Sequence, residues 1–249
     1  MARVLIGTSG WTYASWKGRF YPKELPARRY LEYYSNEFET TEVNYSFYHL
    51  PRPETFARWA DRVPSGFVFS VKASRLITHV KRLQNAEDAW TTFMTNARAL
   101  RAHLGPILLQ FPASFPYDHG RLGSFLERAQ IPESRAEPLR LVFEFRHASW
   151  FQKGVYDALR RHGAALCHAD SPNYPRCDVT TADFIYLRFH GPTRLFASNY
   201  PLKKLEAEAR RLRGYLAEGR DVFAYFNNDA LGHAVANART LRELVQAEA

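Results

Sequence analysis

Short apolar runs recur along the chain, and longer stretches with helical spacing separate them. Eight of these runs are rich in β-branched and aromatic residues and have the length of buried strands. They are Val4–Gly7, Thr40–Asn44, Phe67–Ala73, Ile107–Phe111, Leu141–Phe145, Ala164–Ala169, Phe184–His190 and Val222–Phe226. The stretches between them show helical periodicity with capping residues or prolines at their ends. The predicted helices are Arg28–Phe38, Glu54–Val63, Ala86–His103, Asp118–Gln130, Gln152–His162, Lys203–Glu218 and Leu231–Ala247.

The connection between the sixth and seventh runs departs from this alternation. It reads DSPNYPRCDVTTAD, is rich in proline and shows no helical period, so we expect one helix to be lost or shortened there. Strands that alternate with helices indicate a parallel sheet, and eight such units in 249 residues fit a TIM (β/α)8 barrel. We therefore predict a single α/β TIM-barrel domain over residues 1–249, with a doubly wound open sheet as the alternative.

Within each predicted strand, alternate residues have different character. One face is bulky and apolar, whereas the other becomes polar toward the carboxyl end of the strand. The polar positions are Glu42, Asn44, Ser70, Lys72, Gln110, Glu144, Arg146, His168, Asp170, Tyr186, Arg188, His190, Tyr225 and Asn227. An open sheet covered on both sides would be apolar on both faces, so this pattern favours a barrel with a polar lumen. TIM barrels carry their active sites at the carboxyl ends of their strands, which is where these residues fall.

Several motifs resemble those of a known family. IGTSGW, WKGRFYP, TTEVNYSFY, FSVKASRLITH, LLQFP, FEFRHASW, YLRFHG and YFNNDALGHAVANA occur in the order typical of the YecE-like family, or domain of unknown function 72. The resemblance implies a TIM barrel and supplies no activity, although some members have been compared by fold with endonuclease-IV-like barrels. The chain departs from the family in one place, because Phe196 replaces the first of two tyrosines after the HG dipeptide and only Tyr200 remains. If the missing hydroxyl binds a ligand, this protein has lost it.

The polar lumen predicts a site with acids, bases and anion binders within reach of one small ligand. We assign catalytic roles to Glu42, Lys72, Glu144 and His190. We assign substrate binding to Trp11, Asn44, His79, Gln110, Arg146, Asp170, Arg188, Tyr200 and Asn227. In this scheme Lys72 and Arg188 hold the anion while the two glutamates move protons. The alternative for Glu144 is a salt bridge with Arg188 or Lys72 that only fills the barrel.

Other features suggest further ligands. Asp229 has the position of an N-cap for the last helix, whose free N–H groups would suit an anion. Aromatic residues in the loops after the first two strands, including Trp11 and Tyr48, could stack on a base or sugar or simply fold those loops. Histidines and carboxylates are present, but no tight metal-ligand spacing is, and cations in the lumen would repel a metal. No cofactor is predicted, and a divalent metal is the minor alternative.

The net charge of the chain indicates which kind of partner it binds. The formal net charge of +9 favours anionic or phosphorylated partners. The preferred function is a hydrolase or isomerase that acts on a small phosphorylated or otherwise anionic substrate. The alternatives are a non-catalytic nucleic-acid-binding protein and an endonuclease-IV-like metal-dependent phosphodiesterase. No apolar run reaches the length of about 18 residues that a membrane span needs, and the apolar start is too short for a signal peptide. A cytoplasmic location is therefore expected, with Cys167 and Cys177 as free thiols.

Overall fold

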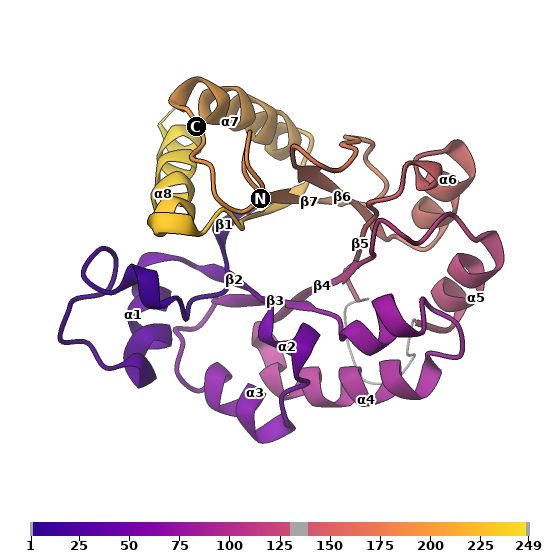
Figure 1. Cartoon of the computed structure of the whole chain (residues 1–249), viewed down its shortest axis with the longest axis horizontal. Coiled ribbons are helices and arrows are strands. Elements are labelled where there is room, and N and C mark those ends of the chain that lie inside the picture. Colours follow the sequence, from indigo (N-terminus) through magenta and orange to yellow (C-terminus); the bar gives the residue numbers. More distant parts are fainter. Residues whose placement is uncertain (1, 130–138, 248–249) are drawn as a thin grey trace.

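A closed barrel of eight parallel strands forms the centre of the molecule (Figure 1). The computed structural model describes residues 2–129 and 139–247. Each strand pairs with the next in sequence, and β1 pairs with β8 to close the barrel. The strands are β1 (Val4–Ser9), β2 (Thr40–Val43), β3 (Val68–Lys72), β4 (Leu104–Gln110), β5 (Leu141–Glu144), β6 (Ala165–Asp170), β7 (Phe184–Phe189) and β8 (Asp221–Phe226). The predicted TIM barrel and its eight strands are confirmed.

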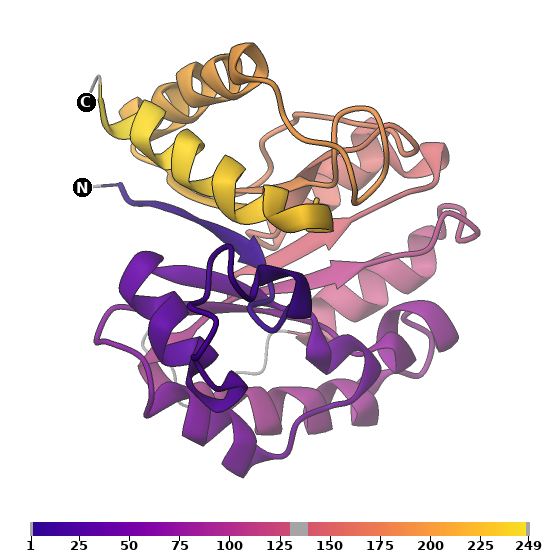
Figure 2. The ribbon, with the colours of Figure 1, turned by 60° about the vertical axis from the view of Figure 1, so that its left-hand side comes forward.

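Helices surround the barrel (Figure 1). They are α1 (Tyr30–Glu37), α2 (Tyr45–Tyr48), α3 (Pro53–Ala60), α4 (Glu87–Ala97), α5 (His119–Ala129), α6 (Lys153–Arg161), α7 (Leu202–Ala217) and α8 (His233–Gln246). Shorter turns are the 3₁₀ segments Ala14–Trp16, Ala27–Arg29, Arg98–His103, Ala148–Trp150 and Ala230–Gly232, and a π-helical turn at Leu76–Val80. The last helix, α8, lies along β1 and so joins the two ends of the chain (Figure 2). No helix in the described parts of the chain combines the length and apolar character needed to cross a membrane.

One feature of the helix predictions is confirmed, and two differ from the structure. The missing helix between β6 and β7 is confirmed, because Pro172 and Pro175 interrupt that connection. The helix predicted over Ala86–His103 is α4 followed by a 3₁₀ segment, with Arg101 at a positive φ of 54°. The four-residue helix α2 was not predicted, since it is too short to show a helical period. The end predicted for the fourth helix, Gln130, lies outside the described residues.

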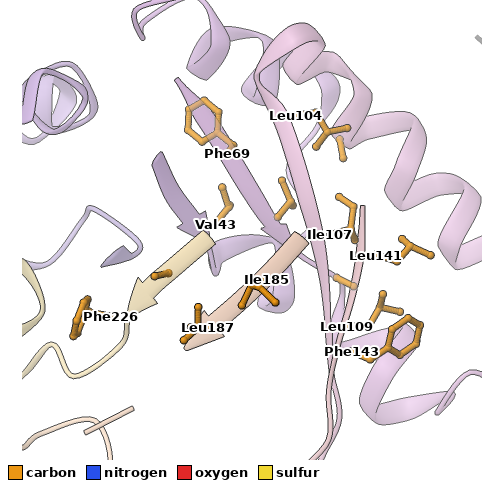
Figure 3. Close-up of a cluster of buried hydrophobic side chains, with 14 of the residues drawn as sticks. Val43, Phe69, Leu104, Ile107, Leu109, Leu141, Phe143, Ile185, Leu187 and Phe226 are labelled. Atoms are coloured by element: carbon orange, nitrogen blue, oxygen red, sulfur yellow. The ribbon is translucent and has the colours of Figure 1, made fainter. Parts of the chain in front are cut away.

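Strand register divides the buried residues into two layers. The outer layer holds Phe69, Ile107, Phe143 and Leu187 among others, and it packs between the strands and the helices (Figure 3). The inner layer fills the barrel below its mouth and consists of Leu5, Leu108, Val142, Ala165, Cys167, Ala169, Ala182, Phe184, Tyr186, Phe223 and Tyr225. Gly7 lies at an inner position, where a Cβ atom would approach the Thr40 carbonyl oxygen to 2.2 Å, so a larger residue would push β1 away from β2.

The face prediction is wrong for β6. In the parallel register Cys167 pairs with Tyr186 and Ala169 with Arg188, so the small residues of β6 face the lumen. His168 and Asp170 therefore face outward, where the His168 ring lies 6.0 Å from Tyr215 of α7. The lumen at this strand is lined by alanine and cysteine, and the two polar residues are buried between β6 and the segments outside the barrel.

The outward carboxylate of Asp170 anchors the segment that replaces the missing helix. Its oxygens accept hydrogen bonds from Tyr200 at 2.9 Å, Lys204 at 2.9 Å and Arg176 at 2.5 Å. Arg176 belongs to the proline-rich connection and also donates to Glu208 of α7 at 2.9 Å. These ion pairs tie the connection to α7 and provide contacts that an amphipathic helix would otherwise make.

Candidate active site

A cavity of about 440 Å³ opens at the carboxyl ends of the strands, where the sequence predicted the site. Residues from several strand ends and loops line it: Tyr13, Asn44, Phe47, Tyr48, Lys72, His79, Gln110, Arg146, Arg188, Phe196 and Asn227. Three of the lining residues, Lys72, Arg146 and Arg188, are cationic, and the lining contains no aspartate or glutamate. The cavity therefore presents positive charge to whatever enters it.

Arg188 lies at the floor of this cavity and is 1% exposed. It faces the lumen because it alternates with the outer residues Leu187 and Phe189 on β7. Its Nε donates to Glu42 Oε2 at 2.8 Å, and its Nη2 donates to Glu42 Oε1 at 2.7 Å. This is the two-pronged pairing of a guanidinium with a carboxylate, which fixes both groups in position. Tyr186 Oη also donates to Glu42 Oε2 at 2.7 Å, and the Ser9 hydroxyl donates to Glu42 Oε1, so each oxygen of Glu42 accepts two hydrogen bonds.

Glu144 is the second carboxylate held by Arg188, through a hydrogen bond from Nη1 to Oε2. Its other oxygen, Oε1, accepts a hydrogen bond from Arg146 Nε at 2.8 Å. His190 is buried beside them, and its Nε2 lies 3.5 Å from Glu144 Oε1 without a hydrogen-bond partner among residues 2–129 and 139–247. Its Nδ1 lies 3.2 Å from Asn227 Nδ2. Glu144 thus joins two arginines and a histidine behind the cavity wall.

Both carboxylates remain ionised in this environment. Burial by itself raises the pKa of Glu42, but the Arg188 charge and its hydrogen bonds outweigh burial and leave this pKa below its usual value. The same opposition acts on Glu144, where burial is outweighed by the charges of Arg188 and Arg146, and its pKa falls well below the usual range. Burial lowers the pKa of His190, which favours its neutral form. The alternative in which Glu144 pairs with Arg188 is therefore the observed arrangement.

Lys72 differs from the other charged residues of the lumen. Its side chain ends at the cavity, and it makes no hydrogen bond or ion pair with any residue in 2–129 or 139–247. Its Nζ lies 4.1 Å from the centre of the Phe47 ring. Burial, together with the charge of Arg188, lowers the pKa of Lys72 to about 7. Near neutral pH, its amine therefore exchanges between charged and neutral forms while facing open space.

Other predicted binding residues line the same cavity with different partners. Asn44 Oδ1 is buried without a hydrogen-bond partner in the described residues, so it is available to a ligand. Gln110 Nε2 donates to the Phe111 carbonyl at 2.7 Å. His79 Nδ1 and the Thr78 hydroxyl share a hydrogen bond of 2.9 Å. Burial and the Lys72 charge lower the pKa of His79 to about 4, which keeps the ring neutral.

Three predicted binding residues do not line the cavity. Asp170 faces outward from β6, as described above. Tyr200 is buried, and its hydroxyl donates to Asp170 while it accepts from Gly191 N at 3.0 Å. Trp11 packs edge-on against Trp59, with ring centres 5.1 Å apart, and lines a neighbouring groove. The structure therefore places Asp170 and Tyr200 in contacts that hold loops, and Trp11 in the neighbouring groove, rather than in the wall of this cavity.

The predicted role of Asp229 as the N-cap of the last helix is wrong. The N-cap of α8 is Gly232, and Asp229 precedes a 3₁₀ turn without capping it through its side chain. Its carboxylate instead accepts a hydrogen bond from the indole of Trp16. Burial raises the pKa of Asp229 to about 7. The turn at Leu231, where φ is 61°, separates Asp229 from the helix, and no sequence period reveals such a turn.

The cavity includes aromatic residues that were not assigned to the site. Phe47 contacts Lys72, and Tyr13 and Tyr48 lie at the rim. Phe196 adopts a left-handed backbone with φ of 59°, and its ring lies 5.5 Å from that of His190. The TTEVNYSFY motif, which contains Phe47 and Tyr48, was the available signal for two of them. By contrast, Trp16, Phe20 and Tyr21 of the first loop are buried against one another and fold that loop.

The side chains that could bind a metal ion do not meet at one point in the described residues. Within residues 2–129 and 139–247, no group of three or more histidine, cysteine, aspartate or glutamate side chains is placed to hold an ion. Glu42 and Glu144 are occupied by arginines, and His168 faces away from the lumen. The residues at the mouth therefore do not fit the endonuclease-IV-like alternative, whose ligands must meet at one point.

Comparison with known proteins identifies relatives across the whole barrel. Residues 5–249 match the model of a family described as "Protein of unknown function DUF72". The UPF0759 protein YecE of Escherichia coli (strain K12) is 30% identical over 161 residues, which cover 64% of this chain and 54% of the relative. This chain thus matches about half the length of that protein. The UPF0759 protein YunF of Bacillus subtilis (strain 168) is 24% identical, over 98% of this chain and 95% of the relative.

Solved structures show the same architecture. The crystal structure of a DUF72 family protein from Thermotoga maritima MSB8 has a TM-score of 0.79 and 28% identity, covering 98% of this chain and 99% of that one. That of a DUF72 family protein from Enterococcus faecalis V583 has a TM-score of 0.81 and 19% identity, covering 97% and 95%. These similarities support the barrel, and the descriptions of these relatives state no reaction.

Proposed function

Because this chain belongs to the DUF72 family, as its motifs indicated, and that description names no reaction, we propose a function from the cavity itself. The protein is an enzyme of the hydrolase or isomerase type that acts on a small phosphorylated or otherwise anionic substrate at the barrel mouth. The observation that carries this proposal is a cavity lined by Lys72, Arg146 and Arg188 with no carboxylate in its wall. Cationic groups that converge on one space, with their carboxylate partners behind its wall, are suited to an anion.

The two arginines have the capacity to bind an anion while they hold the glutamates. Arg146 uses only Nε for Glu144, and the Tyr174 ring, 4.3 Å from its Cζ, steadies the guanidinium. Its two terminal nitrogens make no hydrogen bond with any described residue. Arg188 uses three of its five N–H groups in the contacts above. Both guanidiniums therefore retain donors for phosphate or carboxylate oxygens.

The contacts favour Lys72 rather than Glu42 or Glu144 as the group that moves a proton. A general acid or base works best when its pKa lies near the operating pH. The pKa of Lys72 is lowered to about 7, whereas those of both glutamates are lowered to below their usual values. In this scheme Arg146 and Arg188 bind the anion, Lys72 exchanges a proton with the substrate, and the glutamates keep Arg188 in place. Asn44 and Asn227 orient the polar remainder of the substrate.

Binding of sulfate tests the anion site, because sulfate does not titrate near neutral pH. A bound dianion stabilises the ammonium form of Lys72, so affinity should be highest where the free lysine is already protonated. With a pKa of about 7 for the free protein, the association constant should fall roughly tenfold between about pH 6 and about pH 8. Isothermal titration calorimetry measures this fall together with proton uptake. The variant Lys72→Met should bind weakly at both pH values, and Lys203→Met on α7 is the exposed control.

Turnover tests the enzymatic part of the proposal. Wild-type protein and Lys72→Met should be incubated with a panel of sugar phosphates and nucleotides, and phosphate release and isomer formation should be followed. We expect at least one substrate to be converted by the wild type and at least about a hundredfold more slowly by the variant, the low end for loss of a general acid or base. Anion binding without turnover of any compound in the panel would reject the enzyme and leave a binding protein.

A further inference from the structure

A second hollow adjoins the cavity and is absent from the proposed reaction. It encloses about 750 Å³ between the loop after β1, the helix α2 and the helix α3. We call it the aromatic groove, because its wall includes Trp11, Tyr45, Tyr48 and Trp59. In Figure 1, α2 and α3 lie next to one another on one side of the barrel. Tyr13, Asn44 and Tyr48 line both the groove and the cavity, so the two spaces lie side by side.

The groove exposes aromatic rings that nothing in the described chain covers. Tyr48 is 72% exposed and Tyr45 is 56% exposed, both on the short helix α2. Tyr48 is braced by Phe47, with ring centres 4.9 Å apart and perpendicular planes. Exposed, supported rings of this kind form platforms on which nucleic-acid bases stack.

The charge of the groove identifies its occupant. Arg28, Arg52 and Arg62 contribute to its wall, and no aspartate or glutamate does. The guanidiniums of Arg28 and Arg52 make no hydrogen bond or ion pair with any residue that the structure describes. Arginines that extend beyond one phosphate site, beside exposed tyrosines, match a chain that alternates phosphates with flat bases. A sugar phosphate has one phosphate and one ring, so it would leave most of these arginines and rings without a partner.

We propose that the aromatic groove binds a short single-stranded oligonucleotide whose terminal phosphate occupies the cavity. The inference rests on the proposed function, since it extends the anionic substrate from Lys72 outward. The terminal phosphate contacts Lys72 and Arg146, the first base stacks on Tyr48, and the following phosphates contact Arg52 and Arg28. Asn44, whose unpaired Oδ1 lies at the junction, accepts a hydrogen bond from the first nucleotide.

Fluorescence anisotropy with a labelled oligo(dT) of six nucleotides, with and without a 5′-phosphate, tests this proposal. Tyr48→Ala should weaken binding by at least about fivefold, the low end for loss of one stacked base. Arg52→Gln should reduce the slope of log affinity against log salt concentration by about 0.7, as expected for one phosphate contact on a single strand. Lys72→Met should weaken binding only of the phosphorylated oligonucleotide. Arg210→Gln and Leu202→Ala, exposed positions on α7, should leave all these values unchanged.

The outcomes separate the two proposals. Oligonucleotide binding that is insensitive to Tyr48→Ala and Arg52→Gln, or absent while sulfate still binds in a pH-dependent way, would overturn the groove proposal alone. Equal affinity for a mononucleotide and for the oligonucleotide would also overturn it, because the groove would then add nothing. Failure of both sulfate and oligonucleotide to bind would overturn the groove proposal together with the anion site on which it rests.

Discussion

Replacing Lys72 with methionine should make the protein more stable at neutral pH. The side chain of Lys72 is 9% exposed and has no counter-ion among the described residues. In the unfolded chain a lysine has a pKa of about 10.4, whereas burial lowers that of folded Lys72 to about 7. Folding must therefore release a proton or bury an unpaired charge, and either costs free energy. Methionine has a similar length and no charge, so Lys72→Met removes this cost.

The dependence on pH gives the prediction its sign and magnitude. Between about pH 7 and about pH 10.4 the unfolded chain binds more protons at this lysine than the folded chain does, so wild-type stability rises with pH. The cost of burying Lys72 is full below pH 7, where it amounts to about 4 to 5 kcal/mol at 1.36 kcal/mol per pKa unit. The advantage of Lys72→Met should therefore shrink by about 2 kcal/mol between about pH 7 and about pH 9.

Urea denaturation of both proteins at several pH values and constant ionic strength measures this change. Packing differences between methionine and lysine do not depend on pH, so only the change with pH carries information about the charge. The control Lys203→Met replaces an exposed lysine of α7 and should differ from wild type by a constant amount. A constant difference for Lys72→Met as well would show that Lys72 titrates as an ordinary lysine, and it would refute the argument.

Three further results follow from the same geometry. Arg188→Met should lower the free energy of unfolding by about 3–5 kcal/mol, because it leaves Glu42 and Glu144 buried without their shared partner; a loss below about 1 kcal/mol in urea denaturation would contradict the importance of that pairing. Pyridoxal phosphate, an anionic aldehyde, followed by borohydride should modify Lys72 first at neutral pH, and peptide mapping that finds uniform labelling of lysines would argue against a neutral amine in the cavity. Phe196→Tyr should strengthen sulfate binding by up to about fivefold, the value of one net hydrogen bond; unchanged calorimetry would show that the hydroxyl does not reach the ligand.

The barrel could be predicted from the sequence because alternation along a strand is a local property. Each strand shows which residues share a face, and the number of strands suggests closure. The prediction failed at β6, because either of its two faces could have pointed into the lumen: one is small and the other is polar. His168 and Asp170 are more polar than Cys167 and Ala169, but their partners lie on α7 and in the proline-rich connection. A carboxylate that will be paired by residues distant in sequence cannot be distinguished from one that faces an open site.

The same limit applies to the roles of the lumen charges. The sequence places Glu42, Glu144, Lys72 and Arg188 in one lumen, but it leaves open which cation pairs with which carboxylate. Only the positions of the atoms show that Arg188 engages both glutamates and that Lys72 engages neither. For this reason we propose Lys72, and neither glutamate, as the group that moves a proton. The sequence motif likewise did not reveal the role of Tyr200, whose hydroxyl accepts a hydrogen bond from Gly191 N outside the cavity.

The charges at the mouth support the proposal that this protein binds an anion. Arg146, Arg188 and Lys72 supply three cationic groups against the two carboxylates of Glu42 and Glu144. The two arginines and the two glutamates balance, so the cluster is neutral when Lys72 is neutral and positive when Lys72 is protonated. The pKa of Lys72 is lowered to about 7 because this third cation is buried without a counter-ion. An anionic ligand would remove the cost on binding, so the feature that destabilises the empty barrel would also supply part of its affinity.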